Sequence, residues 1–389
     1  MQNGINLLHP LWAEINLDNL DHNMKQITKR TGSSKIIGIV KCNSYGHGSI
    51  EVSKEFIGLG IKNLAVANVV EAVELRRGGI DCDIMVLGVS LDYTINTIIK
   101  YNIQPAVSSL DFAQKLNEEA EKNNTICEIH IALDTGMGRI GFRKNQESLD
   151  DIRKICSMKN LKIVSMFSHF STADCKDKSY TEFQLDVYNW FYDNLKDCKH
   201  LLGAKNISNS AAIMDLPDTH YDFVRPGIIE YGYYPSDEVN KDVLDLKPVL
   251  TWKSKIVHIK TMEANNFIGY GKNFETKKVS RIATIPVGYG DGYPRALSNK
   301  GYVIINGKLA PITGNVCMDQ IMVDITDIDD VSVNDEVILL GRDKDVKFDA
   351  DDFASLTGTI NYEPLCLIGR RVTRVYIKDN EVSKIQYMD

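Results

Sequence analysis

Short apolar runs alternate with amphipathic helical patterns over the first 232 residues of the chain. The apolar runs are rich in β-branched residues and predict nine strands, at 12–17, 37–40, 64–67, 83–87, 103–107, 127–133, 161–167, 204–207 and 223–225. The segments between them carry apolar residues at helical spacing, as expected of helices that bury one face. This alternation is typical of βα units and predicts a parallel sheet closed as a TIM-like (β/α)8 barrel, with one of the nine strands peripheral.

Polar residues stand where the predicted strands end. An open doubly wound sheet would show a similar alternation, but the first βα turn has no G-x-G-x-x-G phosphate fingerprint, which favours the barrel. Reactive residues of a barrel gather at the carboxyl ends of its strands. Those ends carry Lys41, Asn68, Asp134, His169, Ser210 and Arg225. The sequence therefore predicts a polar site at this end of the barrel.

After about residue 234 the pattern changes to short β-rich runs separated by Gly, Asn and Asp turns. These runs predict strands at 249–259, 281–287, 302–305, 309–312, 320–325, 336–340 and 372–377. Asn306-Gly307 is a hairpin turn candidate, and 350–357 is the one predicted helix. We therefore predict two domains, a barrel at 1–240 and a C-terminal, mostly β domain at 241–389.

Composition restricts the possible partners. The chain has 389 residues, and its 45 basic and 52 acidic side chains give a formal net charge of -7, which argues against a nucleic-acid partner. No apolar run approaches the roughly 18 residues that a membrane-spanning helix needs. The eight cysteines include no C-x-x-C pair, no metal site is predicted, and the start of the chain does not resemble a signal peptide. We expect a cytoplasmic protein with reduced thiols.

Lys41 is the first candidate for chemistry. It follows the apolar run 37–40 directly and precedes a polar turn that contains Gly46 and Gly48. Partial desolvation at such a strand end lowers the pKa of an amine and makes it a usable nucleophile. An isolated lysine at a strand end more often reaches water, so this position alone leaves both interpretations open.

A phosphate site is the second candidate feature. Backbone N–H groups in the turn that contains Gly227 and Ile228, together with Ser210 and Tyr45, are suited to hold a phosphate at a barrel mouth. A buried lysine that faces a phosphate site is the arrangement that a pyridoxal 5'-phosphate enzyme needs. Each element alone is also explained as an ordinary turn. Their occurrence together at strand ends favours the cofactor.

Several motifs resemble the bacterial alanine racemase family, in the order in which that family carries them and over essentially the whole chain. They are Val40-Lys41-Cys42-Asn43-Ser44-Tyr45-Gly46-His47-Gly48, Leu133-Asp134-Thr135-Gly136-Met137-Gly138-Arg139, Ser168-His169-Phe170, Asn209-Ser210-Ala211-Ala212, Arg225-Pro226-Gly227-Ile228, Gly269-Tyr270-Gly271, Val287-Gly288-Tyr289-Gly290-Asp291-Gly292-Tyr293, Val316-Cys317-Met318-Asp319-Gln320 and Ile360-Asn361-Tyr362-Glu363. The resemblance implies a pyridoxal-phosphate-dependent, fold-type III racemase of a small amino acid. It also implies a homodimer in which the active sites are shared between subunits.

The resemblance also implies a role for each matching residue. Lys41 holds the cofactor and is the base on one face of the substrate, and Tyr270 from the second subunit is the base on the other. Arg225 faces the pyridine nitrogen, with His169 beside it. The remaining roles are the phosphate ligands Tyr45, Ser210, Gly227, Ile228 and Tyr362, and the substrate-carboxylate ligands Arg139, Met318 and Asp319.

Elementary chemistry agrees with these roles. Racemisation removes a proton from one face of Cα and returns one to the other, so two flanking bases suffice. A tyrosine acts as a base only when its phenolate is stabilised, and His169 and Arg225 are suited to do so as a polarised network. Because an arginine only donates hydrogen bonds, Arg225 keeps the pyridine nitrogen unprotonated, which disfavours decarboxylation and transamination.

The chain departs from the family at three positions. Many members carry a carbamylated lysine at the position of Ala132, where it orients the carboxylate-binding arginine. The common arginine before Val-Cys-Met-Asp is Asn315 here, and a histidine often found four residues before the phosphate serine is Asn206. These changes alter the surroundings of Arg139 and Arg225 and leave both proposed bases in place.

Three alternative functions remain. A racemase of the same fold acting on serine or on other small amino acids is disfavoured because serine-preferring relatives place a smaller polar residue at the position of Tyr362. A pyridoxal-phosphate decarboxylase is disfavoured by Arg225, where an acidic residue would be expected. A non-catalytic cofactor carrier would resemble the barrel alone, whereas this chain also has the second domain with Tyr270. The implied product, D-alanine, is a peptidoglycan precursor.

Overall fold

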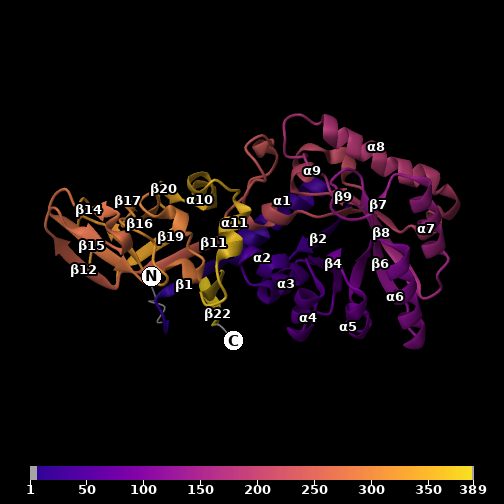
Figure 1. Cartoon of the computed structure of the whole chain (residues 1–389), viewed down its shortest axis with the longest axis horizontal. Helices are drawn as coiled ribbons and strands as arrows, with labels where there is room; N and C mark the ends of the chain where they lie inside the picture. Colours follow the sequence, from indigo (N-terminus) through magenta and orange to yellow (C-terminus); the bar gives the residue numbers. More distant parts are fainter. Residues whose placement is uncertain (1–6, 388–389) are drawn as a thin grey trace. The chain divides into compact units, whose positions relative to one another are not determined.

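The computed structural model describes residues 7–387. Two compact units make up the chain (Figure 1). The barrel unit comprises Leu20–Ser44 and Ser49–Lys247. The β unit comprises the described residues before Leu20, the short segment Tyr45–Gly48 and the described residues from Pro248 onward.

Eight parallel strands close the barrel, which confirms the predicted fold class. Neighbours follow the order β5, β4, β3, β2, β10, β9, β8 and β6, and β6 pairs with β5 to close the ring. The strands are β2 (Lys35–Ile39), β3 (Asn63–Val66), β4 (Asp83–Val89), β5 (Gln104–Val107), β6 (Cys127–Asp134), β8 (Leu161–Phe167), β9 (Ala204–Ser208) and β10 (Phe223–Val224). A two-residue strand, β7 (Phe142–Arg143), pairs with the end of β6.

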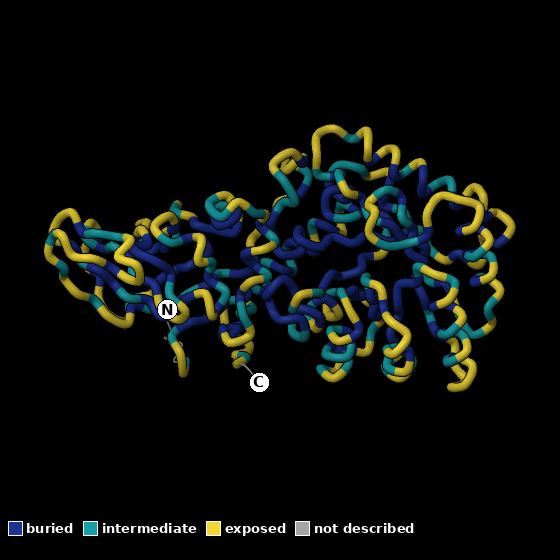
Figure 2. Tube along the Cα trace, viewed as in Figure 1, coloured by how far each residue is buried: buried dark blue, intermediate teal, exposed yellow. Residues whose placement is uncertain are grey.

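Helices alternate with these strands, and their buried faces explain why. In α6, Phe112, Leu116 and Ala120 are buried at helical spacing, and Ser109 caps the start by accepting a hydrogen bond from the Phe112 N–H at 3.3 Å. The helices are α1 (Leu17–Thr31), α3 (Ser49–Gly58), α4 (Val69–Arg77), α5 (Ile95–Lys100), α6 (Leu110–Lys122), α7 (Gln146–Cys156), α8 (Ser179–Asn194) and α9 (Ser210–Asp215). In Figure 2 the inside of the barrel is mostly buried, and exposed residues lie on the helices and loops around it. No helix among the described residues is long and apolar enough to cross a membrane.

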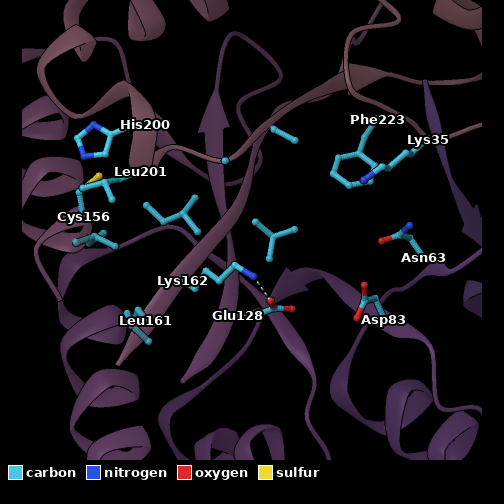
Figure 3. Close-up of a pocket in the computed structure, with 15 residues that line it drawn as sticks. Lys35, Asn63, Asp83, Glu128, Cys156, Leu161, Lys162, His200, Leu201 and Phe223 are labelled. Carbon is cyan, nitrogen blue, oxygen red and sulfur yellow. Dashed lines mark hydrogen bonds and ion pairs between the residues drawn. The ribbon is translucent and has the colours of Figure 1, made fainter. Parts of the chain in front are cut away.

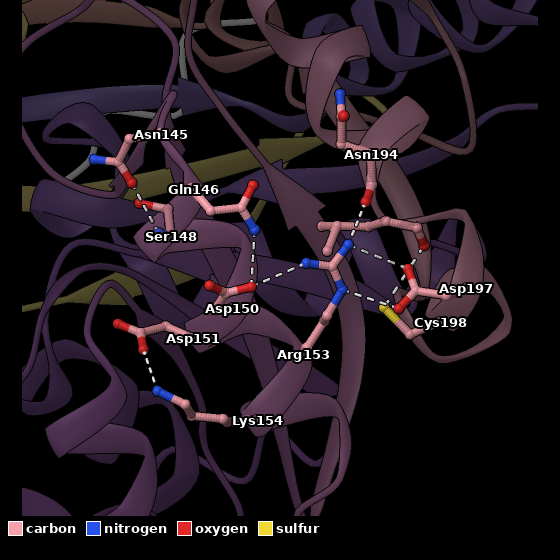
Figure 4. A network of polar contacts seen from close by, with 11 residues as sticks. Asn145, Gln146, Ser148, Asp150, Asp151, Arg153, Lys154, Asn194, Asp197 and Cys198 are labelled. Carbon is pink, nitrogen blue, oxygen red and sulfur yellow. Dashed lines mark hydrogen bonds and ion pairs between the residues drawn. The ribbon is translucent and has the colours of Figure 1, made fainter.

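A charged network ties α7 to the segment after α8 on the outside of the barrel (Figure 4). Arg153 Nε donates to Asp197 at 2.9 Å, Nη1 to Asp150 at 3.2 Å, and Nη2 to the Asn194 carbonyl at 2.7 Å. Because the side chains of this network are largely exposed, its ion pairs add little to the free energy of folding. Their main effect is to hold the two segments in place.

The peripheral strand is the first one, β1 (Leu11–Asn16). It pairs antiparallel with β11 (Leu250–Lys255) and parallel with β21 (Thr373–Lys378), so it belongs to the β unit and not to the barrel. Side-chain burial explains the difference. Both faces of β2 are buried after Lys35, as in a barrel strand, whereas the second half of β1 alternates between buried and half-buried residues.

The β unit contains an eight-stranded sheet, a three-stranded sheet and a short hairpin. Asn306 and Gly307 have φ of 52° and 73°, as a two-residue hairpin turn between β16 and β17 requires. Besides β1, β11 and β21, its strands are β12 (His258–Met262), β13 (Phe267–Ile268), β14 (Phe274–Glu275), β15 (Ser280–Ile285), β16 (Tyr302–Ile305), β17 (Lys308–Pro311), β18 (Ile321–Asp324), β19 (Glu336–Asp343), β20 (Val346–Phe348) and β22 (Glu381–Gln386). The predicted helix is α10 (Ala350–Thr357), and a second helix, α11 (Tyr362–Leu367), was not predicted.

Candidate active site

Lys41 lies two residues after the end of β2 and directly before a left-handed turn. Cys42, Asn43, Ser44 and Tyr45 have φ between 51° and 53°, a conformation that costs an L-residue about 1–2 kcal/mol. Backbone strain of this kind persists only where the surroundings enforce it, and it is common at functional sites. Lys41 itself is half-buried. The lowered pKa that its sequence context suggested stays a prediction.

Glu71 holds the turn in place. One carboxylate oxygen accepts a hydrogen bond from the Cys42 N–H at 2.7 Å, and the other accepts from the Ala67 N–H at 2.7 Å. Asn43 contributes a third restraint, because its side-chain oxygen accepts from the Ser49 N–H at 2.9 Å. Sequence reasoning missed Glu71. Glu71 lies three residues after Asn68, the N-cap of α4, so the sequence is explained by a local capping box. That local explanation gives no sign of the contact with Cys42.

Arg225 is buried at the carboxyl end of the barrel and is surrounded by acceptors. Its Nη2 donates to the Ser168 carbonyl at 2.5 Å and to His169 Nδ1 at 3.3 Å, and its Nη1 donates to the side-chain oxygen of Asn206. Burial, followed by the positive charge of Arg139, lowers the pKa of Arg225 to about 10, so it stays protonated at neutral pH. Asn206, one of the departures from the family, therefore has a clear role as an acceptor for this guanidinium.

His169 is neutral in these surroundings. Burial lowers its pKa well below the usual value, and the positive charges of Arg225, Arg139 and Lys41 lower it further, in that order. Because a guanidinium can only donate, His169 Nδ1 accepts from Arg225, and the ring proton is on Nε2. The structure thus brings four sequence-predicted residues, from four different strand ends, into one electrostatic neighbourhood.

Two short helices of the barrel unit begin next to each other. Ser210 begins α9, and Gly227 and Ile228 begin the short helix η4 (Gly227–Tyr231). The Ser210 hydroxyl donates to the Pro226 carbonyl, which links the two starts. Backbone N–H groups in a first helical turn have no partner within their helix, so they are available to a phosphate. These residues fit the phosphate end of the cofactor.

Tyr45 and Tyr362 are the two predicted phosphate ligands in the β unit. Their ring centroids lie 6.1 Å apart, with the ring planes inclined by 49°. Gly48 lies in the same segment as Tyr45 with φ of 98°, and a Cβ atom built there would lie 1.8 Å from the Tyr376 hydroxyl oxygen. A side chain at Gly48 is therefore excluded for two independent reasons.

Tyr270 lies on an exposed glycine-flanked turn of the β unit. Gly269 and Gly271 have φ of 72° and 75°, and 73% of Tyr270 is exposed. Asn315, another departure from the family, donates a hydrogen bond from its side-chain amide to the Tyr270 carbonyl at 2.7 Å. This residue thus restrains the turn that carries the proposed base.

Met318 and Asp319 lie on a neighbouring loop of the same unit. The Met318 carbonyl accepts from the Gly290 N–H at 2.9 Å. Arg371 orients Asp319, because its Nη2 donates to that carboxylate at 2.7 Å while its Nε donates to the buried Asp291 at 2.5 Å. No sequence motif pointed to Arg371.

Arg139 is exposed and makes no side-chain hydrogen bond with any described residue. Ala132, at the position of the family's carbamylated lysine, is buried and has no polar atom in its side chain. The guanidinium donors of Arg139 are therefore available to an anion.

The barrel also has a cavity at its opposite end, of about 550 Å³ (Figure 3). It is lined by residues from the amino-terminal ends of the strands, including Lys35, Asp83 and Glu128, and Lys162 Nζ lies 2.7 Å from Glu128 Oε1. Active sites of such barrels lie at the carboxyl ends of the strands, so this cavity is separate from the candidate site.

Both parts of the chain match known proteins. Residues 15–235 match the family model of the alanine racemase N-terminal domain, and residues 249–376 match that of the C-terminal domain. The alanine racemase of Clostridium novyi strain NT is 54% identical over 380 residues, which cover 97% of this chain and 98% of that protein. The structure of the alanine racemase of Clostridium difficile 630 aligns with a TM-score of 0.94 at 43% identity and covers 98% of this chain and 100% of that one. That of Bartonella henselae, with covalently bound pyridoxal phosphate, has a TM-score of 0.84 at 27% identity and covers 95% of this chain and 99% of that one.

A closed barrel joined to a mostly β unit, with both units matched, defines a pyridoxal-phosphate enzyme of the fold-type III class. Within that class, the chain belongs to the alanine racemase family. Its enzyme class is therefore that of the isomerases, as the motifs predicted.

Proposed function

We propose that this protein interconverts L-alanine and D-alanine by a two-base mechanism. Lys41 moves the proton on one face of the substrate's Cα, and Tyr270 moves it on the other. Because inversion needs removal and return of a proton on opposite faces, one base on each face is sufficient. Bound pyridoxal 5'-phosphate supplies the electron sink that makes the Cα proton acidic.

The cofactor is held at both ends by residues of this chain. Lys41 binds it covalently, and Arg225 faces the pyridine nitrogen with His169 beside it. The phosphate ligands are Tyr45, Ser210, Gly227, Ile228 and Tyr362.

The observation that carries the proposal is the buried Arg225, fixed by Ser168, Asn206 and His169. A fixed arginine cannot protonate the ring nitrogen, and this favours proton transfer at Cα over decarboxylation.

The substrate's carboxylate is bound by Arg139 and by the Met318 backbone, with Asp319 beside them. Arg139 supports this assignment because its guanidinium is exposed and makes no hydrogen bond with the described residues. Arg371 supports it because it holds the Asp319 carboxylate at 2.7 Å and so fixes that loop. A guanidinium pairs with a carboxylate through two parallel hydrogen bonds, which orients a small amino acid.

We further propose a homodimer in which the barrel domain (1–240) of one subunit and the C-terminal domain (241–389) of the other form each active site. Tyr270 and Met318 are 73% and 54% exposed, so both are accessible to a second chain. Mixed dimers of Lys41→Ala and Tyr270→Phe subunits test this arrangement. If the sites are shared, a mixed dimer has one intact site and one site that carries both substitutions. Half of the dimers are mixed, so about a quarter of wild-type activity should be restored. No restored activity would place both bases in the same subunit.

We place the protein in the cytoplasm, where its product would supply D-alanine for peptidoglycan. In the described part of the chain the eight cysteines form no disulfide, which fits a reducing compartment.

The experiment that tests the activity follows three products in parallel. Purified holoenzyme is given L-alanine or L-serine, and inversion at Cα, α-proton exchange and carbon dioxide release are measured. We expect inversion of alanine, slower inversion of serine, and no carbon dioxide. Faster inversion of serine would favour the broader racemase, and carbon dioxide without inversion would favour a decarboxylase. Cofactor binding without any turnover would favour a carrier.

A further inference from the structure

The backbone of Ile39, two residues before Lys41, lacks a strand partner on one side. In a parallel sheet, successive residues direct their N–H and C=O groups to alternate neighbours. The Lys35 N–H donates to the Asp222 carbonyl on the β10 side, and the Val40 N–H donates to Ala65 on the β3 side. The backbone groups of Ile39 therefore face β10. That strand ends at Val224, which pairs with Ile36, so it does not reach Ile39.

Two side chains of η4 replace the missing strand. The Ile39 N–H donates to both carboxyl oxygens of Glu230 at 3.1 Å, and the Tyr231 hydroxyl donates to the Ile39 carbonyl at 2.7 Å. Both residues belong to the same five-residue helix, which begins with Gly227 and Ile228. The Asn23 side chain fixes this helix from a further direction by donating to the Glu230 carbonyl at 3.1 Å.

Glu230 is an unusual choice for this position. Its exposed fraction is 0%, and no described cationic group forms an ion pair with its carboxyl group. Burial raises its pKa well above the usual value for glutamate, because water cannot solvate the charged form there. A buried carboxylic acid without a cation is expensive to maintain unless its hydrogen bonds are needed. This observation suggests a role beyond filling space.

We infer that Glu230 is a positioning residue that couples the phosphate-binding turn to the strand end that carries Lys41. A phosphate bound to the Gly227 and Ile228 N–H groups adds a further restraint on η4. Glu230 and Tyr231 transmit this restraint to Ile39, and through it to the direction of the Lys41 side chain. The inference rests on the proposed function for the phosphate site and for Lys41. It adds that the two ends of the cofactor are linked through the protein.

Two substitutions separate this role from simple packing. Glu230→Gln keeps a side-chain acceptor for the Ile39 N–H, whereas Glu230→Leu fills a similar volume without one. Ser254→Ala is the matched control, because Ser254 is buried and donates to the Pro10 carbonyl in the β unit, away from β2. The probes are pyridoxal 5'-phosphate and pyridoxal, which differ only in the phosphate.

Affinity of each apoenzyme for both probes is measured by absorbance of the bound probe, and hydrogen exchange reports the Ile39 amide. For Glu230→Leu we expect roughly tenfold weaker binding of pyridoxal 5'-phosphate, unchanged binding of pyridoxal and roughly tenfold faster exchange at Ile39. Glu230→Gln and the control should match the wild type in probe affinity. The inference is wrong if Glu230→Leu loses affinity for both probes equally or for neither.

A separate outcome tests the underlying assignment. If the wild-type apoenzyme binds both probes equally well, the proposed phosphate site fails, whatever the variants do. If Glu230→Leu does not fold, Tyr231→Phe carries the test, because it removes only the hydroxyl bond to Ile39. It should weaken pyridoxal 5'-phosphate binding about fivefold and leave pyridoxal binding unchanged. Equal affinity for pyridoxal 5'-phosphate in Tyr231→Phe and wild type would refute the coupling.

Discussion

Glu71→Ala should release the strained turn beside Lys41. Four consecutive left-handed residues, Cys42 to Tyr45, cost roughly 4–8 kcal/mol in total, so the turn depends on its restraints. The Glu71 carboxylate supplies two of them, at 2.7 Å each. The bond to Cys42 is exposed and contributes about 1 kcal/mol, and the partly buried bond to Ala67 about 2 kcal/mol. We therefore expect Glu71→Ala to lower the free energy of unfolding by about 3 kcal/mol.

The assay combines urea unfolding of the holoenzyme with alanine racemisation. We expect a lower kcat as well as the stability loss, because Cys42 follows Lys41 directly and the turn sets the direction of the lysine. Glu147→Ala is the matched control. Glu147 lies in the first turn of α7, is exposed, and should change stability by less than about 0.5 kcal/mol. A Glu71→Ala enzyme with wild-type kcat would refute the idea that the restrained turn orients Lys41.

Three further predictions concern residues around the site and in the barrel core. Burial lowers the pKa of His130 to about 3, whereas the unfolded residue takes up a proton near pH 6.5. The free energy of unfolding should therefore fall by about 1.4 kcal/mol for each pH unit below 6.5. At about pH 5 the His130→Gln variant should not show this decrease. Asn315→Ala removes the bond to the Tyr270 carbonyl and should lower kcat about fivefold at an unchanged melting temperature; an unchanged kcat would show that the turn needs no such restraint. Arg371→Met leaves Asp291 buried without its cation and frees the loop at Met318, so steady-state kinetics should show a higher KM for alanine, whereas a change in kcat alone would contradict the role.

Much of the fold follows from local pattern. The wholly apolar run before Lys41 identifies a strand buried on both faces, and Asn306-Gly307 identifies a hairpin that the structure contains. The partner of β1 was not predictable in the same way. Its sequence is equally apolar at the start, and only pairing with strands more than 230 residues away assigns it to the other unit.

In the candidate site, too, local sequence identifies some residues, whereas others depend on contacts with distant parts of the chain. The proposed bases and the proposed phosphate-binding turns lie within the motifs that resemble the family, so the sequence alone points to them. Glu71, Glu230 and Arg371 act through contacts with residues 29, 191 and 80 positions away, respectively, and no local pattern encodes such pairs. Asn206 and Asn315 were visible only as departures from the family. Their hydrogen bonds to Arg225 and to the Tyr270 backbone emerged only from the fold.

The most direct test of the two-base claim is racemisation of L-alanine in heavy water, stopped early. Nuclear magnetic resonance then reports deuterium at Cα in the product and in the remaining substrate. With Lys41 and Tyr270 on opposite faces, the proton removed on one side is not the one returned on the other. We predict D-alanine that carries solvent deuterium, while the recovered L-alanine remains almost unlabelled. D-alanine that retains the original Cα hydrogen would contradict the account, because a single base would then carry the proton across.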